Sequence, residues 1–121
     1  MEVIAISKNV RQSPRKLRLV AAMAKKLPLG SALDRLALLP KSAAKPIRKT
    51  LQSALSNAVT NAKIDEKSLS IKNILVDEGF RMKRYDKSHS YRFNRGLIQK
   101  QAAHVTVILE DKKEKEDKKD G

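Results

Sequence analysis

The stretch LSIKNILVDEGFRMKRYDKSHSYRFNRGLIQKQAAHVTVIL, residues 69–109, decides the architecture of this chain. Apolar residues in its first eight positions recur with a period of two and an irregularity near Asn73, which predicts a strand. The final VTVIL predicts a second strand. Between them, Phe80 to Ala103 contains few large aliphatic residues and no proline. A structureless loop of that length is unusual in a compact domain. We therefore expect a long hairpin that continues both strands and turns between Asp86 and Gly96.

The N-terminal part of the chain predicts a strand followed by a helix. Residues 2–7 (EVIAIS) include β-branched side chains and predict a short strand. Ser13-Pro14 predicts a helix start, because serine can cap free N–H groups and proline loses no hydrogen bond at the first helical position. The helix is expected to extend to about Lys26, before Pro28 and Gly30 end it. Its apolar face consists of Leu17, Val20, Ala21 and Ala24.

Two more helices are expected before the long hairpin. Residues 31–39 (SALDRLALL) predict a short helix that Pro40 closes. The next helix either begins after Pro40 and kinks at Pro46, or begins near Lys45 with Pro46 in its first turn. Together these patterns predict three strands and three helices, with two of the strands continuing into a protruding β-hairpin. The apolar face of the third helix consists of Ile47, Leu51, Leu55, Ala58 and Ala62, with Ala54 and Val59 beside it.

Composition limits the classes of protein that remain. A chain of 121 residues predicts one compact domain, and the absence of cysteine excludes disulfides, thiolate metal sites and thiol nucleophiles. The apolar runs Val3–Ile6 and Leu19–Ala24 are too short for a signal peptide or a membrane span, so we expect a soluble, intracellular protein. Residues 110–121 (EDKKEKEDKKDG) predict a disordered charged tail. The expected division is one domain, residues 1–109 with a hairpin arm at about 80–103, followed by this tail.

Charge is the strongest functional signal in the sequence. The chain carries 27 Lys and Arg against 13 Asp and Glu, a net charge of +14. The last twelve residues hold six acids and five lysines, so the preceding 109 residues carry 22 basic and seven acidic side chains, a net charge of +15. A body this basic repels itself unless something anionic neutralises it. A nucleic-acid partner is therefore favoured over an anionic membrane.

The sequence gives no support to an enzyme, a metal site or a cofactor. The two histidines, His89 and His104, are not accompanied by clustered carboxylates. There is no Gly-rich phosphate loop and no pair of metal ligands at helical spacing. We expect no catalytic residues, no metal and no cofactor.

A basic cluster surrounds the start of the first predicted helix. Cations in a first helical turn are unfavourable by about 0.3–1 kcal/mol each, because the helix N-terminus is itself partially positive. A bound phosphate reverses that sign, since free N–H groups and basic side chains then converge on it. The alternative is a solvated basic face. The predicted phosphate contacts are Arg11, Arg15, Lys16 and Arg18.

A second basic cluster lies in the predicted hairpin, where only Asp86 is acidic. Aromatic residues are interleaved with the cations, and rings can stack on unpaired bases while Arg and Lys hold phosphates. The rings can equally pack the two hairpin strands together. The predicted RNA contacts are Arg81, Lys83, Arg84, Lys87, Arg92, Arg95 and Lys100, and the candidate stacking residues are Tyr85, Tyr91 and Phe93.

Several motifs in this order resemble the family of the twenty-second protein of the bacterial large ribosomal subunit. The resemblance rests on SPRKLRLVA (13–21), PKSAAKPIRKTLQSALSNAVTNA (40–62), VDEG (76–79), MKR (82–84) and HVTVIL (104–109). It covers about residues 1–109. The hairpin departs from the family pattern, because it lacks proline, carries Asp86 and is slightly longer.

The resemblance implies an α+β structural protein of the cytoplasmic ribosome that binds large-subunit ribosomal RNA early in assembly. It implies that the first-helix cluster contacts RNA from the body, while the arm contacts RNA through Lys83, Arg84, Arg92, Arg95 and Lys100. It also implies a hairpin that reaches the peptide exit tunnel, near where macrolide antibiotics bind. The other partners are neighbouring ribosomal proteins and the nascent peptide, without a membrane or an obligate homo-oligomer. The expected tunnel-facing tip is Ser88, His89, Ser90, Tyr91, Arg92, Phe93 and Asn94.

Two other readings of the charge remain open. An architectural DNA-binding protein would be similarly basic, but that class more naturally has a dimerisation surface or a base-reading helix. A membrane-surface protein needs large apolar residues opposite a basic helical face, and the first helix offers mainly Leu, Val and Ala, which the small core needs. Ribosomal RNA is therefore the favoured partner.

Overall fold

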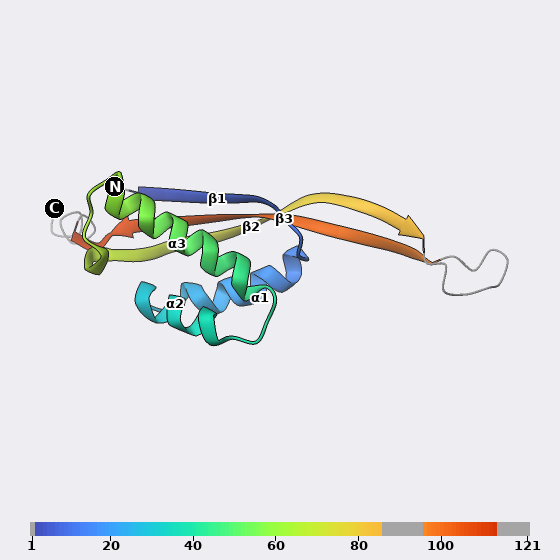
Figure 1. The fold of residues 1–121 in the computed structure, drawn as a ribbon, viewed down its shortest axis with the longest axis horizontal. Coiled ribbons are helices and arrows are strands. Elements are labelled where there is room, and N and C mark those ends of the chain that lie inside the picture. The colour runs from blue at the N-terminus through green and yellow to red at the C-terminus, as the bar shows by residue number, and fades with distance from the viewer. Residues whose placement is uncertain (1, 86–95, 114–121) are drawn as a thin grey trace.

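The computed structural model describes residues 2–85 and 96–113. In this part of the chain, one antiparallel sheet contains β1 (Glu2–Val10), β2 (Leu69–Tyr85) and β3 (Leu97–Asp111) in the order β1-β3-β2 (Figure 1). β2 and β3 are much longer than β1, because both continue out of the body as a two-stranded arm. The predicted three-stranded sheet and protruding hairpin are confirmed, and the expected tip lies outside the described residues.

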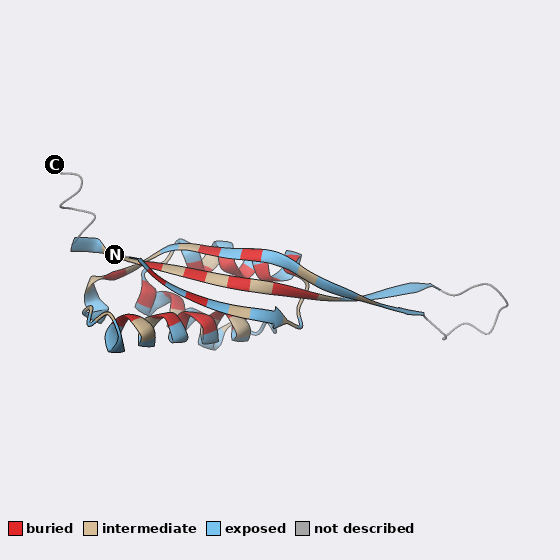
Figure 2. Cartoon of the chain, turned by 90° about the horizontal axis from the view of Figure 1, so that it is seen from above, coloured by how far each residue is buried: buried red, intermediate tan, exposed pale blue. Residues whose placement is uncertain are grey.

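The central strand, β3, carries the sheet's contribution to the core. Its side chains at Ala103, Val105, Val107 and Leu109 are fully buried, and the intervening residues are only partly buried. This period of two is visible as alternating colours along the strands in the body (Figure 2). Successive side chains of a strand point to opposite faces, so one face of the sheet is packed and the other is open. The open face exposes Ile4, Ile6 and Leu75.

Three helices cover the packed face of the sheet (Figures 1 and 2). They are α1 (Pro14–Lys25), α2 (Leu29–Leu38) and α3 (Ala44–Thr60), and a short 3₁₀ helix, η1 (Glu66–Ser68), precedes β2. α1 packs mainly on β2, α3 packs on β1 and β3, and α2 packs against α3. The predicted apolar face of α1 is confirmed, since Leu17, Val20, Ala21 and Ala24 are all buried.

Pro46 lies in the first turn of α3, which decides between the two interpretations of this helix start. α3 begins at Ala44, so the missing N–H of Pro46 falls among groups that have no partner within the helix. The carbonyl oxygen of Pro46 accepts a hydrogen bond from Thr50 Oγ1 at 2.8 Å. That bond satisfies the hydroxyl of Thr50, which is the buried polar residue of the described core.

Two details of the helix prediction are wrong. Gly30 does not end a helix but lies in the first turn of α2, which begins at Leu29 directly after Pro28. The fixed backbone of Pro28 is compatible with a helix start, so α2 begins earlier than its apolar pattern indicated. Val59, which was expected beside the apolar face of α3, is 45% exposed because it lies toward the solvent side of the helix.

A β-bulge marks the border between the body and the arm. Gly79 and Phe80 lie opposite the single residue Ala102 between the paired positions on either side. A Cβ on Gly79 would lie 3.0 Å from the Ala102 carbonyl oxygen. The close approach of the two backbones therefore favours glycine at this position, and the bulge increases the local twist where the arm leaves the body. The described part of the arm is 81–85 of β2 paired with 97–101 of β3.

Two further irregularities lie inside the body. The register shift between Ile71 and Asn73 confirms the irregularity predicted near Asn73. The other lies in β1 between Ser7 and Val10, where Asn9 adopts a positive φ of 59°. The backbone N–H of Asn9 donates to Nδ1 of His104 at 3.1 Å, so this histidine stabilises the bulge of β1.

The C-terminal boundary of the sheet lies slightly beyond the predicted one. β3 continues to Asp111. Its residue Glu110 is paired with Glu2 of β1 and with Ser70 of β2. These first two residues of the expected tail therefore belong to the sheet. The prediction of a disordered tail falls mainly on residues 114–121, which lie outside the described residues.

Candidate nucleic-acid interface

The positive ends of two helices lie at the end of the body from which the arm projects. α1 and α3 both begin near the base of the arm, and the start of β1 and the end of β3 lie at the opposite end of the body (Figure 1). Neither helix has an acidic residue in its first turn. Ser13 precedes α1 with an extended backbone, but its hydroxyl makes no capping hydrogen bond, contrary to our expectation. Both helix dipoles thus add positive potential where the cations gather.

The two basic clusters of the sequence meet in one hollow at the base of the arm. Residues from the start of α1 and from β3 line a depression of about 520 Å³. Lys16 and Lys100 come together there with Arg11, although Lys100 belonged to the hairpin cluster in the sequence. The lining is Arg11, Gln12, Ser13, Lys16, Gln99, Lys100 and Gln101.

A second hollow, of about 610 Å³, continues from the first across the start of α3. The two hollows share Arg11 and Gln12, and the second adds Lys41, Lys45 and Lys49. We call the six cations of these hollows the basic surface: Arg11, Lys16, Lys41, Lys45, Lys49 and Lys100. Neither lining contains an acidic residue.

The basic surface is electrostatically unlike the open face of the sheet. Among the described residues, none of its six cations forms an ion pair. On the open sheet face, by contrast, Lys72 forms an ion pair with Glu2. The hydrogen bond from Lys72 to the Glu2 carboxylate, and the charge of that carboxylate, raise the pKa of Lys72 above 10.5. The described residues therefore provide no ion-pair partner for the basic surface.

Lys41, Lys45 and Lys49 are the residues of the basic surface that the sequence prediction missed. Lys41 lies in the loop before α3, Lys45 and Lys49 lie in its first two turns, and all three are exposed. A signal was present, because Lys41, Lys45 and Lys49 recur at intervals of four and therefore follow one side of a helix start.

Arg15, Arg18 and Arg81 are predicted contacts outside the basic surface, and two of them have partners inside the protein. Arg15 is exposed on α1 but lines neither hollow. Arg18 donates from Nη2 to the Val76 carbonyl oxygen at 3.1 Å, which ties α1 to β2. Arg81 pairs with Glu78 at 3.3 Å in an exposed ion pair. Such exposed pairs contribute about 0–1 kcal/mol, so they compete weakly with an external anion.

Basic side chains occupy both faces of the arm. Residues directly opposite in a sheet share a face, and the register pairs Lys83 with Gln99 and Arg84 with Ile98. Lys83 therefore lies on one face, together with Tyr85, and Arg84 lies on the other with Lys100. The predicted contacts Lys87, Arg92 and Arg95, the tip Ser88–Asn94 and the rings of Tyr91 and Phe93 lie outside the described residues.

Tyr85 is the one candidate stacking residue that the structure describes. It is paired with Leu97 across the arm, yet it remains 65% exposed. Packing between the two strands therefore does not bury this ring. Its aromatic face is accessible to an external base.

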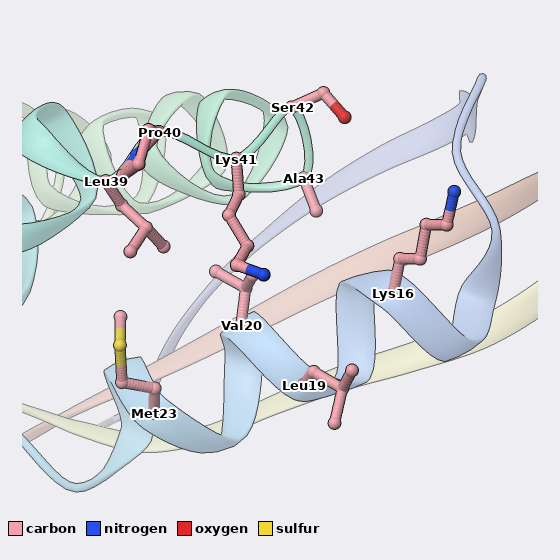
Figure 3. Close-up of a pocket in the computed structure, with 9 residues that line it drawn as sticks. All are labelled: Lys16, Leu19, Val20, Met23, Leu39, Pro40, Lys41, Ser42 and Ala43. Carbon is pink, nitrogen blue, oxygen red and sulfur yellow. The ribbon is translucent and has the colours of Figure 1, made fainter.

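A third hollow lies between α1 and the loop that joins α2 to α3, and it is mainly apolar. Met23 points toward Leu39 across it, Lys41 extends into it from the loop, and Leu19 and Lys16 line it from α1 (Figure 3). It shares Lys16 with the first hollow and Lys41 with the second. We call it the apolar groove.

Other kinds of site receive no positive evidence. The described residues contain no group of three or more His, Cys, Asp or Glu side chains that could hold a metal ion. In the same part of the chain, no helix combines the length and the apolar character needed to cross a bilayer.

Comparison with known proteins identifies close relatives over nearly the whole chain. The family model described as ribosomal protein L22p/L17e matches residues 5–110. Large ribosomal subunit protein uL22 of Methylacidiphilum infernorum is 43% identical over 95% of this chain and 99% of its own length. The uL22 proteins of Fusobacterium nucleatum and Akkermansia muciniphila are 42% and 40% identical, each over 92% of this chain and 98% and 97% of their own lengths, respectively.

Proposed function

The chain belongs to the L22p/L17e family of ribosomal proteins, and we propose that its basic surface and arm bind large-subunit ribosomal RNA. Family membership makes it a structural, non-enzymatic component of the large subunit of the cytoplasmic ribosome. RNA binding by particular residues is our inference for this chain. It is supported by the position of the six cations and by the absence of acids among them.

The observation that carries the proposal is the meeting of two basic clusters without counter-charge. Arg11 and Lys100 are far apart in the sequence but line the same hollow. Two helix N-termini add partial positive charge at the same end of the body. A phosphate backbone has the regularly spaced negative charges that such an extended surface requires.

The arm extends the proposed interface away from the body. Its cations on both faces favour insertion between RNA segments over docking on a single surface. Exposed Tyr85 adds a stacking face beside Lys83. We propose that the arm ties separate parts of the folded RNA together and thereby supports assembly of the subunit.

The finer assignment concerns the tip of the arm, residues 88–94. We propose that it lines the peptide exit tunnel and meets the nascent peptide, on the support of family membership and of an arm that protrudes from the body. Neighbouring ribosomal proteins are the other proposed partners, and no obligate homo-oligomer is required. A stalled nascent chain with photoreactive groups along its length should crosslink to this protein. Crosslinks that persist after removal of residues 86–95 would contradict the assignment.

Salt-dependent binding tests the RNA proposal. For the full chain, log affinity for large-subunit ribosomal RNA should fall linearly with log salt concentration, by roughly 0.7–0.9 per phosphate neutralised. Lys45→Gln should make that slope shallower by roughly 0.7–0.9, the value for one phosphate contact, because Lys45 is exposed on the basic surface. Lys72→Gln is the matched control, since Lys72 lies on the open sheet face against Glu2.

Duplex DNA of equal length separates the ribosomal proposal from an architectural DNA-binding role. We expect the RNA to bind more tightly, because the arm has exposed Tyr85 for unpaired bases and cations on two faces. Equal affinity for the two nucleic acids would count against ribosomal RNA as the specific partner. If Lys45→Gln and Lys72→Gln gave the same slope of log affinity against log salt concentration, the basic surface would not be the RNA-binding site.

A further inference from the structure

The apolar groove combines apolar walls with two positively charged residues, Lys16 and Lys41. It has a volume of about 440 Å³ and lies between α1 and residues 39–43. Leu19, Val20 and Met23 line it from α1, and Leu39 and Pro40 line it from the loop (Figure 3). Its ionisable residues are two lysines, and it has no acidic lining residue.

Leu19 shows that the groove leaves apolar surface exposed to solvent. The side chain is 72% exposed although it lies in the middle of α1. Leu19 does not stand alone, because Met23 and Leu39 line the same hollow and are only partly buried. Apolar side chains that gather in this way mark binding surfaces, whereas scattered single ones do not. The stability of α1 gives no reason for it, because the buried face of the helix is already complete without Leu19.

The two lysines define which apolar ligand fits. Lys41 extends from the loop toward Val20, so its aliphatic stem forms part of the wall and its ammonium group lies beside α1 (Figure 3). Lys16 lines the groove from α1 and also lines the hollow at the base of the arm. The ligand must therefore present an apolar flat or compact group together with negative charge. An unstacked nucleotide has this combination, with a base attached to a phosphate backbone.

The groove is also continuous with the proposed path of the RNA. It shares Lys16 with one hollow of the basic surface and Leu39, Pro40, Lys41 and Ser42 with the other. A strand held by the basic surface thus passes the mouth of the groove. Gln12 adds a polar group at this junction, where Ser42 Oγ donates weakly to Gln12 Oε1 at 3.5 Å.

We propose that the apolar groove receives one unstacked nucleotide of the bound RNA. Its base lies between the side chains of α1 and those of the loop, and its flanking phosphates lie at Lys16 and Lys41. Apolar side chains sandwich extruded bases in this way in proteins that hold a base outside the helix. The inference rests on the proposed RNA-binding function and specifies what the RNA must present to this face.

Two RNA duplexes of about 16 base pairs test the inference with the full chain. One is fully paired, and the other carries a single unpaired 2-aminopurine nucleotide in its middle. The bulged duplex should bind roughly tenfold more tightly, as expected for one base held by protein side chains, and its fluorescence should change on binding. Leu19→Gln should remove that preference. Leu38→Gln is the matched control, because Leu38 is 85% exposed on α2 and does not line the groove.

The outcomes separate failure of this inference from failure of RNA binding. If neither duplex binds, the proposed function itself is contradicted. If both bind equally and the fluorescence is unchanged, RNA binding stands and the nucleotide site is overturned. A preference that persists in Leu19→Gln also overturns it, because the unpaired base is then held elsewhere.

Crosslinking in assembled large subunits tests the competing occupant, a segment of a neighbouring protein. A photoreactive p-benzoylphenylalanine at position 19 should form adducts with RNA, and the same group at position 38 should not form them at that nucleotide. Adducts of position 19 with protein alone would overturn the inference in favour of a polypeptide occupant.

Discussion

The body and the arm are made from the same two strands, yet only the body buries them. In β3, Val105, Val107 and Leu109 are fully buried beneath the helices, whereas residues 97–100 are all exposed. The arm therefore has backbone pairing but almost no apolar burial, and an isolated two-stranded hairpin is only marginally stable in water. The difference teaches that burial maintains the body, while the arm depends on whatever surrounds it in the assembled particle.

The largest expected effect comes from comparing two leucines of β3. Leu109→Ala should lower the free energy of unfolding by about 2–5 kcal/mol, because it leaves a cavity under the helices. Leu97→Ala in the arm should change it by less than about 0.5 kcal/mol, since that side chain is 53% exposed. Urea unfolding followed by circular dichroism measures both. Similar losses would mean that the arm contributes to the core, against our division.

Two glycines sharpen the comparison at the border of the body. Gly79→Ala should lower the free energy of unfolding by about 1–3 kcal/mol, because the new Cβ meets the Ala102 carbonyl at 3.0 Å. Gly30→Ala is the control, with nothing within 4 Å of the added carbon, and should raise it by about 0.4–1 kcal/mol. Thermal unfolding of both variants measures the difference. A neutral Gly79→Ala would show that the bulge can relax.

Shortening the arm should have a still smaller effect on the body. Met82 and Lys100 are directly paired, so replacing residues 83–99 by Asn-Gly closes the hairpin with a two-residue turn. The free energy of unfolding should stay within about 0.5 kcal/mol of the full chain, as for a surface change. Affinity for ribosomal RNA and its salt dependence should both fall, as measured by filter binding. Loss of the circular dichroism signal of the helices would contradict the independence of the body.

The smallest expected effect lies on the open face of the sheet, at Lys72. Its pKa is raised by Glu2, so the pair stabilises the fold below pH 10.5 and this contribution is lost as the pH rises through the higher folded pKa. Glu2→Gln should return the pKa of Lys72 toward 10.5 and remove that part of the pH dependence. Titration of the lysine side chain by NMR measures the shift. An unchanged titration in the variant would show that Glu2 is not its cause.

Burial explains how much of the fold was readable from the sequence. The period of two in 69–76 and 105–109 and the helical spacing of Leu17, Val20 and Ala24 arise because one face of each element packs on the core. All of these predictions are confirmed. The early start of α2 was missed, because Leu29 and Gly30 belong to a first turn that carries no clear period.

The candidate site was only partly readable, for a different physical reason. Charge clusters close in sequence were recognised, but the meeting of Arg11 with Lys100 depends on the register of a sheet that the sequence does not state. Lys41, Lys45 and Lys49 were not predicted, because single lysines four residues apart are also common on the solvated side of a helix. The hydrogen bond of Arg18 to Val76 likewise requires knowledge of which strand lies beside α1.

The alternation of side chains along the arm, beyond the bulge at Gly79, limits how the arm can change in length during evolution. Each residue added to a strand lengthens the arm by about 3.3 Å. It also moves every side chain beyond the insertion to the opposite face of the arm. One extra pair would turn Tyr85 and its neighbours to the opposite side, whereas two pairs restore their orientation about 7 Å farther out. Arms of related chains that bind the same surroundings should therefore differ in steps of two residues per strand, unless a second bulge compensates.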